Sequence, residues 1–317
     1  MSRPKVLVTD STVNVDKLRK IADVDQYDAV GQMPRKELIE RSRNVDGLFC
    51  LLRDKIDKEF LSNCEKLKVI GTMSVGYEHL DIEECKKRAI KVGYTPGVLT
   101  EATAELGISL LLAVSRRIVE AADSAKSGGW STWTPYYMCG KAISGQTIGF
   151  YGLGAIGKSM AEKLEPFKPG RILYHNRKPR NDVPGYEYVD FDTLLKESDF
   201  LICTVAATAE NKGIFNTEAF KKMKSDAIFV NVSRGVLVKM DDLNSALESG
   251  EIYAAGLDVT DPEPLPLDHP LFQRRNCTIL PHIGSATVAT RNLMASTTVD
   301  NIFNALSGEK MVASVVE

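Results

Sequence analysis

The sequence has little that would direct it to a membrane or to nucleic acid. No apolar run is long enough to cross a bilayer, and the opening residues Met1 to Lys5 hold no apolar stretch of the kind found in signal peptides. The formal net charge of -2 gives no reason to expect nucleic acid or an anionic membrane surface as a partner. We therefore expect a cytoplasmic protein with neither kind of partner.

Cysteine and histidine are also scarce. The six cysteines show no C-x-x-C spacing, and Cys50 and Cys203 lie in predicted strands. We interpret the cysteines as reduced, small apolar residues and expect no disulfide and no metal site. Only four histidines are present. Because histidine is the side chain that most readily exchanges a proton near neutral pH, few positions can carry acid–base chemistry of that kind.

The chain is long and apolar enough for two domains, with 317 residues and 44% hydrophobic content. In its first third, four short apolar runs predict strands, and helical patterns at 57–64 and 82–88 lie between them. The predicted strands are 6–8, 47–50, 69–71 and 90–92. This alternation is typical of a parallel sheet with crossover helices.

A long helical pattern follows, from Thr100 to Ser127, and we expect it to cross from one domain to the other. Gly128 and Gly129 end it. The next segment, 130–137, holds both tryptophans of the chain in what should be an exposed loop. Exposed aromatic residues of this kind usually mark an interface between proteins.

A second series of strands and helices begins after the loop. The predicted strands are 147–151, 171–175, 200–203, 227–231, 254–258 and 278–280. The last helix, 287–306, lies beyond this sheet, and we expect it to return to the first domain. The predicted fold class is α/β, with two doubly wound parallel-sheet, Rossmann-like domains and an interdomain cleft. We expect a flavodoxin-like, substrate-binding domain of residues 1–98 plus 288–317 and a nucleotide-binding domain of residues 99–287.

The most informative motif lies early in the second domain. The segment Gly152-Leu153-Gly154-Ala155-Ile156-Gly157 follows the predicted strand 147–151 and opens a helical pattern that ends at Leu164. In such a unit the first glycine makes the tight turn and the second lets the backbone approach a pyrophosphate. The third lets the helix pack on the strand, and the start of the helix attracts phosphate. The segment therefore predicts a dinucleotide site.

The next predicted strand, 171–175, ends where a fold that binds NAD carries an acid for the ribose hydroxyl. Here neutral Asn176 is followed by Arg177, Lys178 and Arg180. Arginine binds phosphate oxygens through charge-assisted hydrogen bonds, whereas a carboxylate would repel them. The segment favours NADP and NADPH as cofactors, and the alternative is a solvated basic turn.

Three titratable or charged residues have the right place for chemistry, because ligands of open α/β sheets bind beyond the carboxyl ends of the strands. They are Arg234, Glu263 and His282, the one histidine in such a position. Reduction of a keto acid needs a proton donor and a cation for the substrate carboxylate. His282 and Arg234 could supply these, while a carboxylate such as Glu263 favours a protonated imidazole and fixes its orientation. Each could instead be an ordinary turn residue.

The sequence resembles the D-isomer-specific 2-hydroxyacid dehydrogenase family, most closely its glyoxylate/hydroxypyruvate reductase branch. The resemblance covers nearly the whole chain. Besides the glycine loop, it rests on the segments MSVGYEHL at 73–80, GYTPGVLT at 93–100, NVSRG at 231–235, AGLDVT at 255–260 and PHIGSAT at 281–287.

The resemblance implies NADPH-dependent reduction of glyoxylate to glycolate and of hydroxypyruvate to D-glycerate. It implies that Arg234, Glu263 and His282 are the catalytic set, with His282 as the proton donor. The implied substrate-binding residues, among which the Val75 and Gly76 amides would bind the carboxylate, are Leu52, Val75, Gly76, Trp133, Arg234, His282 and Ser285. The implied cofactor-binding residues are Gly152, Leu153, Gly154, Ala155, Ile156, Gly157, Asn176, Arg177, Lys178, Arg180, Val205, Ala206, Val232, Ser233, Arg234, Asp258, His282 and Gly284.

In this family the segment from about 100 to 140 builds a homodimer, so the resemblance also implies a second copy of the chain as partner. Trp133 could then reach the partner's active site or serve only in dimer packing. Two departures from the family pattern concern the cofactor. Val205-Ala206-Ala207-Thr208 stands where relatives often have Pro-Leu-Thr, and Ala155 replaces a frequent arginine.

Two other functions fit parts of the pattern. The fold also resembles dinucleotide-binding transcriptional corepressors, which keep similar catalytic residues. The basic segment 177–180 favours a metabolic enzyme over a corepressor. The other is a dehydrogenase for another D-2-hydroxy acid such as 3-phosphoglycerate, although a phosphoglycerate dehydrogenase would usually prefer NAD. A formate dehydrogenase would be expected to carry Gln-His in the partner role, so Glu263 argues against it.

Overall fold

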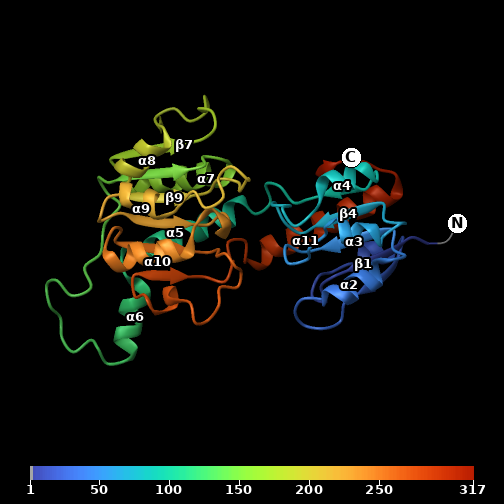
Figure 1. Ribbon diagram of the computed structural model, residues 1–317, viewed down its shortest axis with the longest axis horizontal. Coiled ribbons are helices and arrows are strands. Elements are labelled where there is room, and N and C mark those ends of the chain that lie inside the picture. Colours follow the sequence, from blue (N-terminus) through green and yellow to red (C-terminus); the bar gives the residue numbers. More distant parts are fainter. Residues whose placement is uncertain (1–2) are drawn as a thin grey trace. The chain divides into compact units, whose positions relative to one another are not determined.

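The computed structural model describes residues 3–317, which form two compact units. Of the described residues, unit 1 comprises 3–99 and 286–317, and unit 2 comprises 100–285 (Figure 1). The chain therefore leaves unit 1 once and returns to it once. Each unit is an α/β domain with a largely parallel sheet, in agreement with the predicted fold class.

Unit 1 is built on a six-stranded sheet in the order β13-β5-β4-β3-β1-β2. All neighbours are parallel except β13, which pairs antiparallel with β5. The strands are β1 (Lys5–Val8), β2 (Asp23–Gln26), β3 (Gly47–Cys50), β4 (Val69–Thr72), β5 (Lys91–Gly93) and β13 (Ser314–Val316). The order of β2, β1, β3, β4 and β5 is that of the flavodoxin-like arrangement, which changes direction between β1 and β3.

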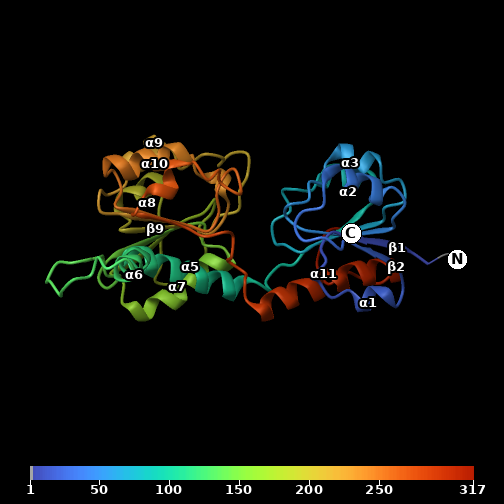
Figure 2. The same ribbon diagram turned by 90° about the horizontal axis from the view of Figure 1, so that it is seen from below.

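Helices cover both faces of this sheet (Figure 2). They are α1 (Asp16–Arg19), α2 (Arg35–Ser42), α3 (Lys58–Ser62), α4 (Ile82–Lys87) and α11 (Val288–Ser307). Alternation along β1 explains the two layers, because Leu7 packs in one core with α2 and α3, while Val6 and Val8 pack in the other with α11. The last helix, α11, belongs to unit 1, where it packs against β3, β4 and β5.

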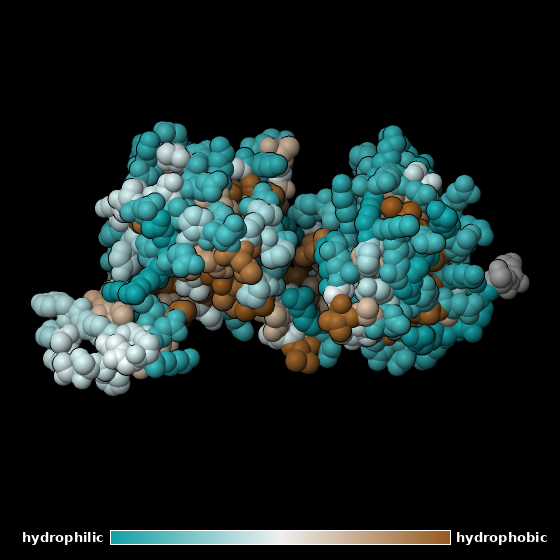
Figure 3. Space-filling model, turned by 60° about the horizontal axis from the view of Figure 1, so that its bottom comes forward, coloured by the Kyte–Doolittle hydropathy of each residue, from teal (hydrophilic) through white to brown (hydrophobic). Residues whose placement is uncertain are grey.

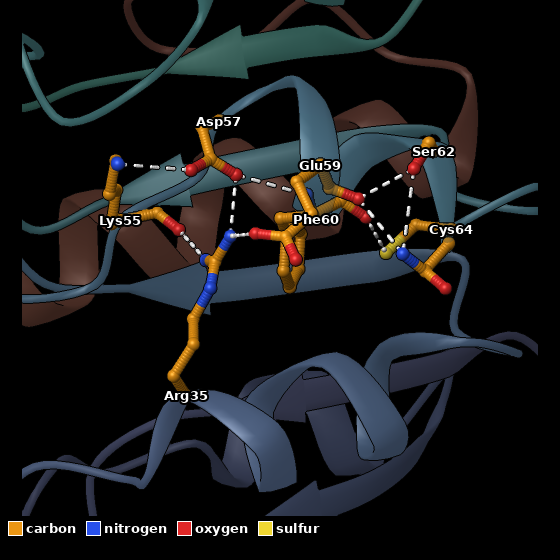
Figure 4. Close-up of polar contacts among 8 residues, drawn as sticks. Arg35, Lys55, Asp57, Glu59, Phe60, Ser62 and Cys64 are labelled. Atoms are coloured by element: carbon orange, nitrogen blue, oxygen red, sulfur yellow. Dashed lines mark hydrogen bonds and ion pairs between the residues drawn. The ribbon is translucent and has the colours of Figure 1, made fainter.

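The start of α3 shows how local sequence defines an element (Figure 4). Asp57 lies before the helix, and its Oδ1 accepts a hydrogen bond of 3.0 Å from the Phe60 amide, which would otherwise lack a partner. The same carboxylate lies 2.5 Å from Arg35 Nη2 and 3.3 Å from Lys55 Nζ. Arg35 starts α2, so this cap also joins two helices on one face of the sheet.

Unit 2 is built on a seven-stranded parallel sheet in the order β12-β11-β10-β9-β6-β7-β8. The strands are β6 (Thr147–Tyr151), β7 (Arg171–His175), β8 (Glu187–Tyr188), β9 (Phe200–Cys203), β10 (Ile228–Asn231), β11 (Ala254–Leu257) and β12 (Cys277–Ile279). Four consecutive strands, β9 to β12, extend from one side of β6, and β7 and β8 extend from the other. The sheet order therefore reverses between β6 and β9, where ligands of this fold bind.

Two layers of helices enclose the sheet of unit 2, with α5, α6 and α7 on one face and α8, α9 and α10 on the other (Figure 2). These helices are α5 (Thr100–Ser115), α6 (Ile118–Lys126), α7 (Ala155–Leu164), α8 (Phe191–Glu197), α9 (Thr217–Lys222) and α10 (Met240–Ser249). Short 3-10 turns at Glu165–Phe167, Gly235–Leu237 and Pro270–Gln273 complete the unit. Each face has its own continuous apolar core.

The prediction of one helix from Thr100 to Ser127 that crosses between domains was wrong. The helix breaks after Ser115, because Arg117 takes a left-handed conformation with φ of 53°, and both α5 and α6 belong to unit 2. The chain returns to this point from the loop beyond α6, and the Lys141 amide donates a 2.8 Å hydrogen bond to the Ser115 carbonyl. A Cβ at Gly140 would overlap that carbonyl oxygen, so the crossing requires glycine.

The aromatic segment 130–137 is exposed, as predicted, and projects beyond the body of unit 2 as the green loop of Figure 1. Trp133 and Tyr136 expose 78% and 89% of their surface. In the space-filling view the same projection is pale, of intermediate hydropathy, unlike the largely teal surface around it (Figure 3). Most of the surface of these two side chains therefore contacts no other part of unit 2.

The cysteines are all free, as predicted, and Cys50 and Cys203 lie buried in strands. Cys139 lies exposed after the aromatic segment. Among residues 3–317, no helix combines the length and the apolar character that a membrane crossing requires.

Candidate functional site

The glycine loop has the geometry that its sequence predicts. Gly152 follows β6 with φ of +99°, and a Cβ there would overlap the Val205 backbone. A Cβ at Gly157 would lie 2.5 Å from the Gly152 carbonyl oxygen, whereas one at Gly154 would meet no heavy atom within 4 Å. The first and third glycines are therefore needed for packing. The second keeps an open approach to the backbone, which suits a pyrophosphate.

The start of α7 supplies donors for such an anion. Gly154 is the N-cap, and none of the amides of Gly154, Ala155 and Ile156 donates a hydrogen bond to an acceptor within residues 3–317. Leu153 differs from its neighbours, because its side chain is buried, its amide donates to Asn176 Oδ1 and its carbonyl accepts from Arg180 Nη1. Leu153 thus fixes the loop from inside.

The basic segment after β7 divides into two roles. Asn176 and Arg180 hold the glycine loop through Leu153, at 2.7 and 2.9 Å. Arg180 also binds Asp182 through two nitrogens, at 2.8 and 2.6 Å, and this ion pair holds the pKa of the Asp182 carboxyl well below its usual value. The two residues are therefore engaged within the protein, which the sequence could not show.

Arg177 and Lys178 are the cations of the segment that stay available. Both side chains are exposed, and neither makes a hydrogen bond or ion pair with any described residue. The charge of Arg177 contributes to a lowered pKa of the Glu210 carboxyl, after the hydrogen bond from Thr208. Arg177 and Lys178 follow directly after Asn176, beside the glycine loop. Two unpaired cations at this position fit a phosphate on the adenosine ribose.

The loops after β9 and β10 are joined. The Ser233 hydroxyl donates to the Val205 carbonyl, and Thr204 Oγ1 donates to the Gly152 carbonyl. The side-chain Nδ2 of buried Asn211 donates to the Ala206 carbonyl at 3.0 Å. This bond fixes the backbone of the segment that replaces Pro-Leu-Thr. The Ser233 hydroxyl hydrogen is therefore already bound within the protein, whereas the Val232 carbonyl accepts no hydrogen bond from any described residue.

The three candidate catalytic residues gather at the carboxyl ends of β10, β11 and β12 in unit 2. His282 Nδ1 and Glu263 Oε1 are 2.5 Å apart, so one edge of the imidazole is fixed, and its Nε2 makes no hydrogen bond within residues 3–317. His282 has φ of 54°, an uncommon backbone conformation for histidine. Its amide donates to the Asp258 carbonyl at 2.9 Å, which anchors the residue to the end of β11.

The charge of Glu263 is set by its neighbours. Partial burial would raise the pKa of the Glu263 carboxyl, but the hydrogen bond and charge of His282, the Thr260 amide and the charge of Arg234 together hold its pKa below the usual value. Glu263 is therefore a carboxylate at neutral pH, and Arg234 lies close enough to contribute to that state. The arrangement combines a cation, an anion and an imidazole at one edge of the sheet.

Three residues that support this arrangement were missed or only partly understood from the sequence. Asp258 is buried and accepts from the amides of Ile283 and Gly284, both at 2.8 Å, so it braces the loop that carries His282. Burial raises the pKa of the Asp258 carboxyl, against the two amide hydrogen bonds, which lower it.

Asn231 and Gly235 support Arg234 in the same way. Asn231 Nδ2 donates to the Arg234 carbonyl at 2.9 Å, and Asn231 Oδ1 accepts from the Ser233 amide at 3.0 Å. A Cβ at Gly235 would overlap the Thr260 carbonyl oxygen, so glycine lets this loop pack on the turn that carries Glu263. Two signals for Asn231 were present in the sequence: its place at the end of an apolar predicted strand and its inclusion in the NVSRG segment of the family resemblance.

The remaining substrate candidates lie in different places. Val75 and Gly76 follow β4 of unit 1, partly exposed, and neither amide donates a hydrogen bond to a described residue. Leu52 follows β3 of unit 1 and is exposed. In unit 2, Ser285 is buried next to the His282 loop, whereas Trp133 lies on the projecting loop.

Comparison with known proteins places this geometry in a family. Residues 108–284 match the family model described as D-isomer specific 2-hydroxyacid dehydrogenase, NAD binding domain. The chain is 48% identical over 293 residues to the glyoxylate reductase/hydroxypyruvate reductase of Mus musculus, a match that covers 91% of this chain and 89% of the mouse protein.

Two solved structures share the fold of both units. A protein from Thermus thermophilus is 41% identical with a TM-score of 0.93, and the match covers 98% of this chain and 100% of that one. An NADPH-dependent glyoxylate/hydroxypyruvate reductase from Sinorhizobium meliloti, in complex with NADP and malonate, is 30% identical with a TM-score of 0.88, covering 99% and 97% of the two chains. The chain belongs to the D-isomer-specific 2-hydroxyacid dehydrogenase family.

Proposed function

We propose that the protein reduces glyoxylate to glycolate and hydroxypyruvate to D-glycerate, with NADPH as the hydride donor. The observation that carries the proposal is the 2.5 Å contact between His282 and Glu263, beside Arg234, in the same unit as a dinucleotide-type glycine loop. Relatives named as glyoxylate or hydroxypyruvate reductases in both animals and archaea support the substrate class.

The residues present fit a bound dinucleotide, because the glycine loop leaves an open approach at Gly154 and offers free amides at the start of α7. When bound, the nicotinamide supplies the hydride. His282 Nε2 donates the proton to the developing alkoxide, since Nδ1 is held by Glu263. Glu263 stabilises the protonated imidazole and fixes its orientation, as carboxylate partners of histidine generally do.

The substrate carboxylate is bound by cationic and amide donors. Arg234 supplies the positive charge, and the amides of Val75 and Gly76, which have no acceptor in the described chain, supply neutral donors. Leu52, Ser285 and Trp133 stay assigned to the surroundings of the substrate. The Val232 carbonyl and Asp258 are assigned to the nicotinamide carboxamide, and Val205, Ala206 and Gly284 to further cofactor contacts.

The preference for NADPH rests on Arg177 and Lys178. Both are exposed, have no partner among the described residues and stand where an NAD-binding fold carries its acid. The NADP complex of the Sinorhizobium meliloti relative supports a phosphorylated cofactor. Of the other two cofactor candidates after β7, we assign Asn176 and Arg180 to holding the loop.

We also propose that the chain forms a homodimer through the segment from about 100 to 140. The exposed side chains of Trp130, Trp133 and Tyr136 on the projecting loop support this assignment, because a second copy would remove their apolar surface from water.

The experiment that tests the function compares wild type with His282→Ala and with His269→Asn, a control at a histidine that caps the 3-10 turn Pro270–Gln273 and for which asparagine can also serve as a cap. Wild type should oxidise NADPH when glyoxylate or hydroxypyruvate is added. His282→Ala should lose turnover by about 100-fold or more while it keeps its affinity for NADPH, because a general acid contributes about that much. NADPH binding without turnover in wild type would instead favour a dinucleotide sensor. Loss of NADPH binding in His282→Ala would indicate a structural role.

A further inference from the structure

The loop after β4 in unit 1 carries a chain of three polar side chains that the proposed chemistry does not use. Thr72 ends β4, Ser74 follows two residues later, and His79 lies beyond the turn. Thr72 Oγ1 lies 2.7 Å from Ser74 Oγ and 3.0 Å from His79 Nε2, and Ser74 Oγ lies 2.6 Å from the Gly76 carbonyl oxygen. Thr72 and Ser74 are buried.

The hydrogen atoms of this chain can be assigned from its end. A carbonyl oxygen can only accept, so the Ser74 hydroxyl donates to Gly76. Ser74 Oγ must then accept from the Thr72 hydroxyl, because its own hydrogen is used. Thr72 Oγ1 in turn accepts from His79 Nε2, which must carry a hydrogen. Burial raises the pKa of the nearby Cys50 thiol and keeps it protonated, and a neutral thiol is a weaker acceptor for the Thr72 hydroxyl than Ser74 Oγ.

The backbone of the same loop is held from the neighbouring strands. The Met73 amide donates to the Cys50 carbonyl at 3.0 Å, and the Thr95 amide donates to the Ser74 carbonyl at 2.9 Å. With the Ser74 side chain bound to the Gly76 carbonyl, the peptide groups around Val75 are fixed on both sides. In this loop, the amides of Val75 and Gly76 make no hydrogen bond to any described residue.

We propose that Thr72, Ser74 and His79 are positioning residues, which hold the Val75 and Gly76 amides in the geometry that binds the substrate carboxylate. The inference rests on the proposed function, because that function assigns the carboxylate to these amides. A preformed pair of donors binds an anion more tightly than the same donors in a flexible loop, because the loop loses no conformational freedom when the anion binds.

The test uses the full-length protein and compares Ser74→Ala, Thr72→Val and the conservative Thr72→Ser with Thr95→Val. Thr95 is a matched control, because it is buried beside Ser74, its hydroxyl has no partner within residues 3–317, and valine has nearly its shape. For each variant, KM and kcat for hydroxypyruvate and the Kd for NADPH are measured.

Ser74→Ala and Thr72→Val should raise KM for the keto acid by about tenfold, roughly the value of one hydrogen bond, while the Kd for NADPH stays unchanged. Thr72→Ser should restore the wild-type KM, and Thr95→Val should leave it unchanged. A merely structural role would lower thermal stability without this selective effect on KM. If Ser74→Ala fails to fold, the comparison of Thr72→Val with Thr72→Ser decides.

An active wild type in which Ser74→Ala and Thr72→Val raise KM no more than Thr95→Val would overturn this inference and leave the proposed function intact. A wild type that binds NADPH but reduces neither keto acid would overturn the proposed function, and the inference with it.

Discussion

At the scale of single residues, the contact between His282 and Glu263 has the most direct chemical meaning. The sequence indicated both residues because each follows a strand, and strand ends share one edge of a parallel sheet. It could not show that the two side chains lie 2.5 Å apart, since this depends on Asp258 bracing the histidine loop. The residue types and their positions after strands could be predicted from the sequence, whereas the hydrogen bonds that support them could not.

The charge of Glu263 leads to a prediction about pH. Because the pKa of its carboxyl lies below the usual value of 4.5, Glu263 stays ionised throughout the neutral range, and its titration cannot set an activity limit there. Glu263→Gln removes the anion that favours a protonated imidazole. The alkaline limb of kcat/KM should therefore move to lower pH, as measured with saturating NADPH. An unchanged profile in an active Glu263→Gln variant would show that this carboxylate does not control the proton donor.

The glycines of the loop make a second prediction, because their surroundings differ. Gly154→Ala should fold with unchanged stability, since its Cβ meets no heavy atom within 4 Å, yet bind NADPH about tenfold or more weakly. Gly152→Ala should cost about 2 kcal/mol of stability, because it combines a φ of +99° with an overlap of the new Cβ and the Val205 backbone. Thermal unfolding and fluorescence titration with NADPH check both. Equal effects of the two substitutions on stability would contradict the assigned roles.

At the scale of elements, short-range patterns predicted more than long-range contacts. Strands β6, β7 and β9 and helix α7 have the bounds expected from their apolar patterns, since these patterns are local. The break between α5 and α6 was not predicted, because neither the left-handed backbone of Arg117 nor the hydrogen bond from Lys141 back to Ser115 is visible in the local apolar pattern. Likewise, the pairing of Arg180 with Asp182 decides which cations stay free, and composition alone cannot reveal it.

The cap of α3 gives a prediction at this scale. Asp57 has a pKa of about 2 in the folded protein against a usual 3.8, despite burial, because Phe60, Arg35 and Lys55 stabilise its charge. Its contribution is therefore complete above about pH 4 and is lost as the pH falls toward 2. Asp57→Ala should cost about 1 kcal/mol at neutral pH. Asp57→Asn, which keeps a cap acceptor without the charge, should cost less.

Urea unfolding of the three proteins at several pH values checks this prediction. The difference in free energy of unfolding between wild type and either variant should shrink between about pH 4 and about pH 2. A difference that stays constant over that range would mean that the ion pairs around Asp57 contribute nothing.

At the scale of the whole molecule, the two units and the discontinuous first unit follow from the order of elements along the chain. The projecting aromatic loop has no such explanation within one chain, and the proposed dimer accounts for it. Sedimentation velocity should give the mass of two chains for wild type. Replacing Trp130, Trp133 and Tyr136 by serine should shift the protein toward one chain without unfolding it, because these side chains support no core. A wild type that sediments as a single chain at micromolar concentration would refute the dimer.

NADPH-dependent reduction of a keto acid is the central proposal, and cofactor discrimination tests it most directly. The measurement is kcat/KM for NADPH and for NADH with saturating hydroxypyruvate, in wild type, in Arg177→Ala and in the exposed-lysine control Lys221→Ala. We expect wild type and the control to prefer NADPH by at least about tenfold and Arg177→Ala to lose most of this preference, because the exposed guanidinium binds the ribose phosphate. A wild type that uses NADH as well as NADPH would contradict the proposal.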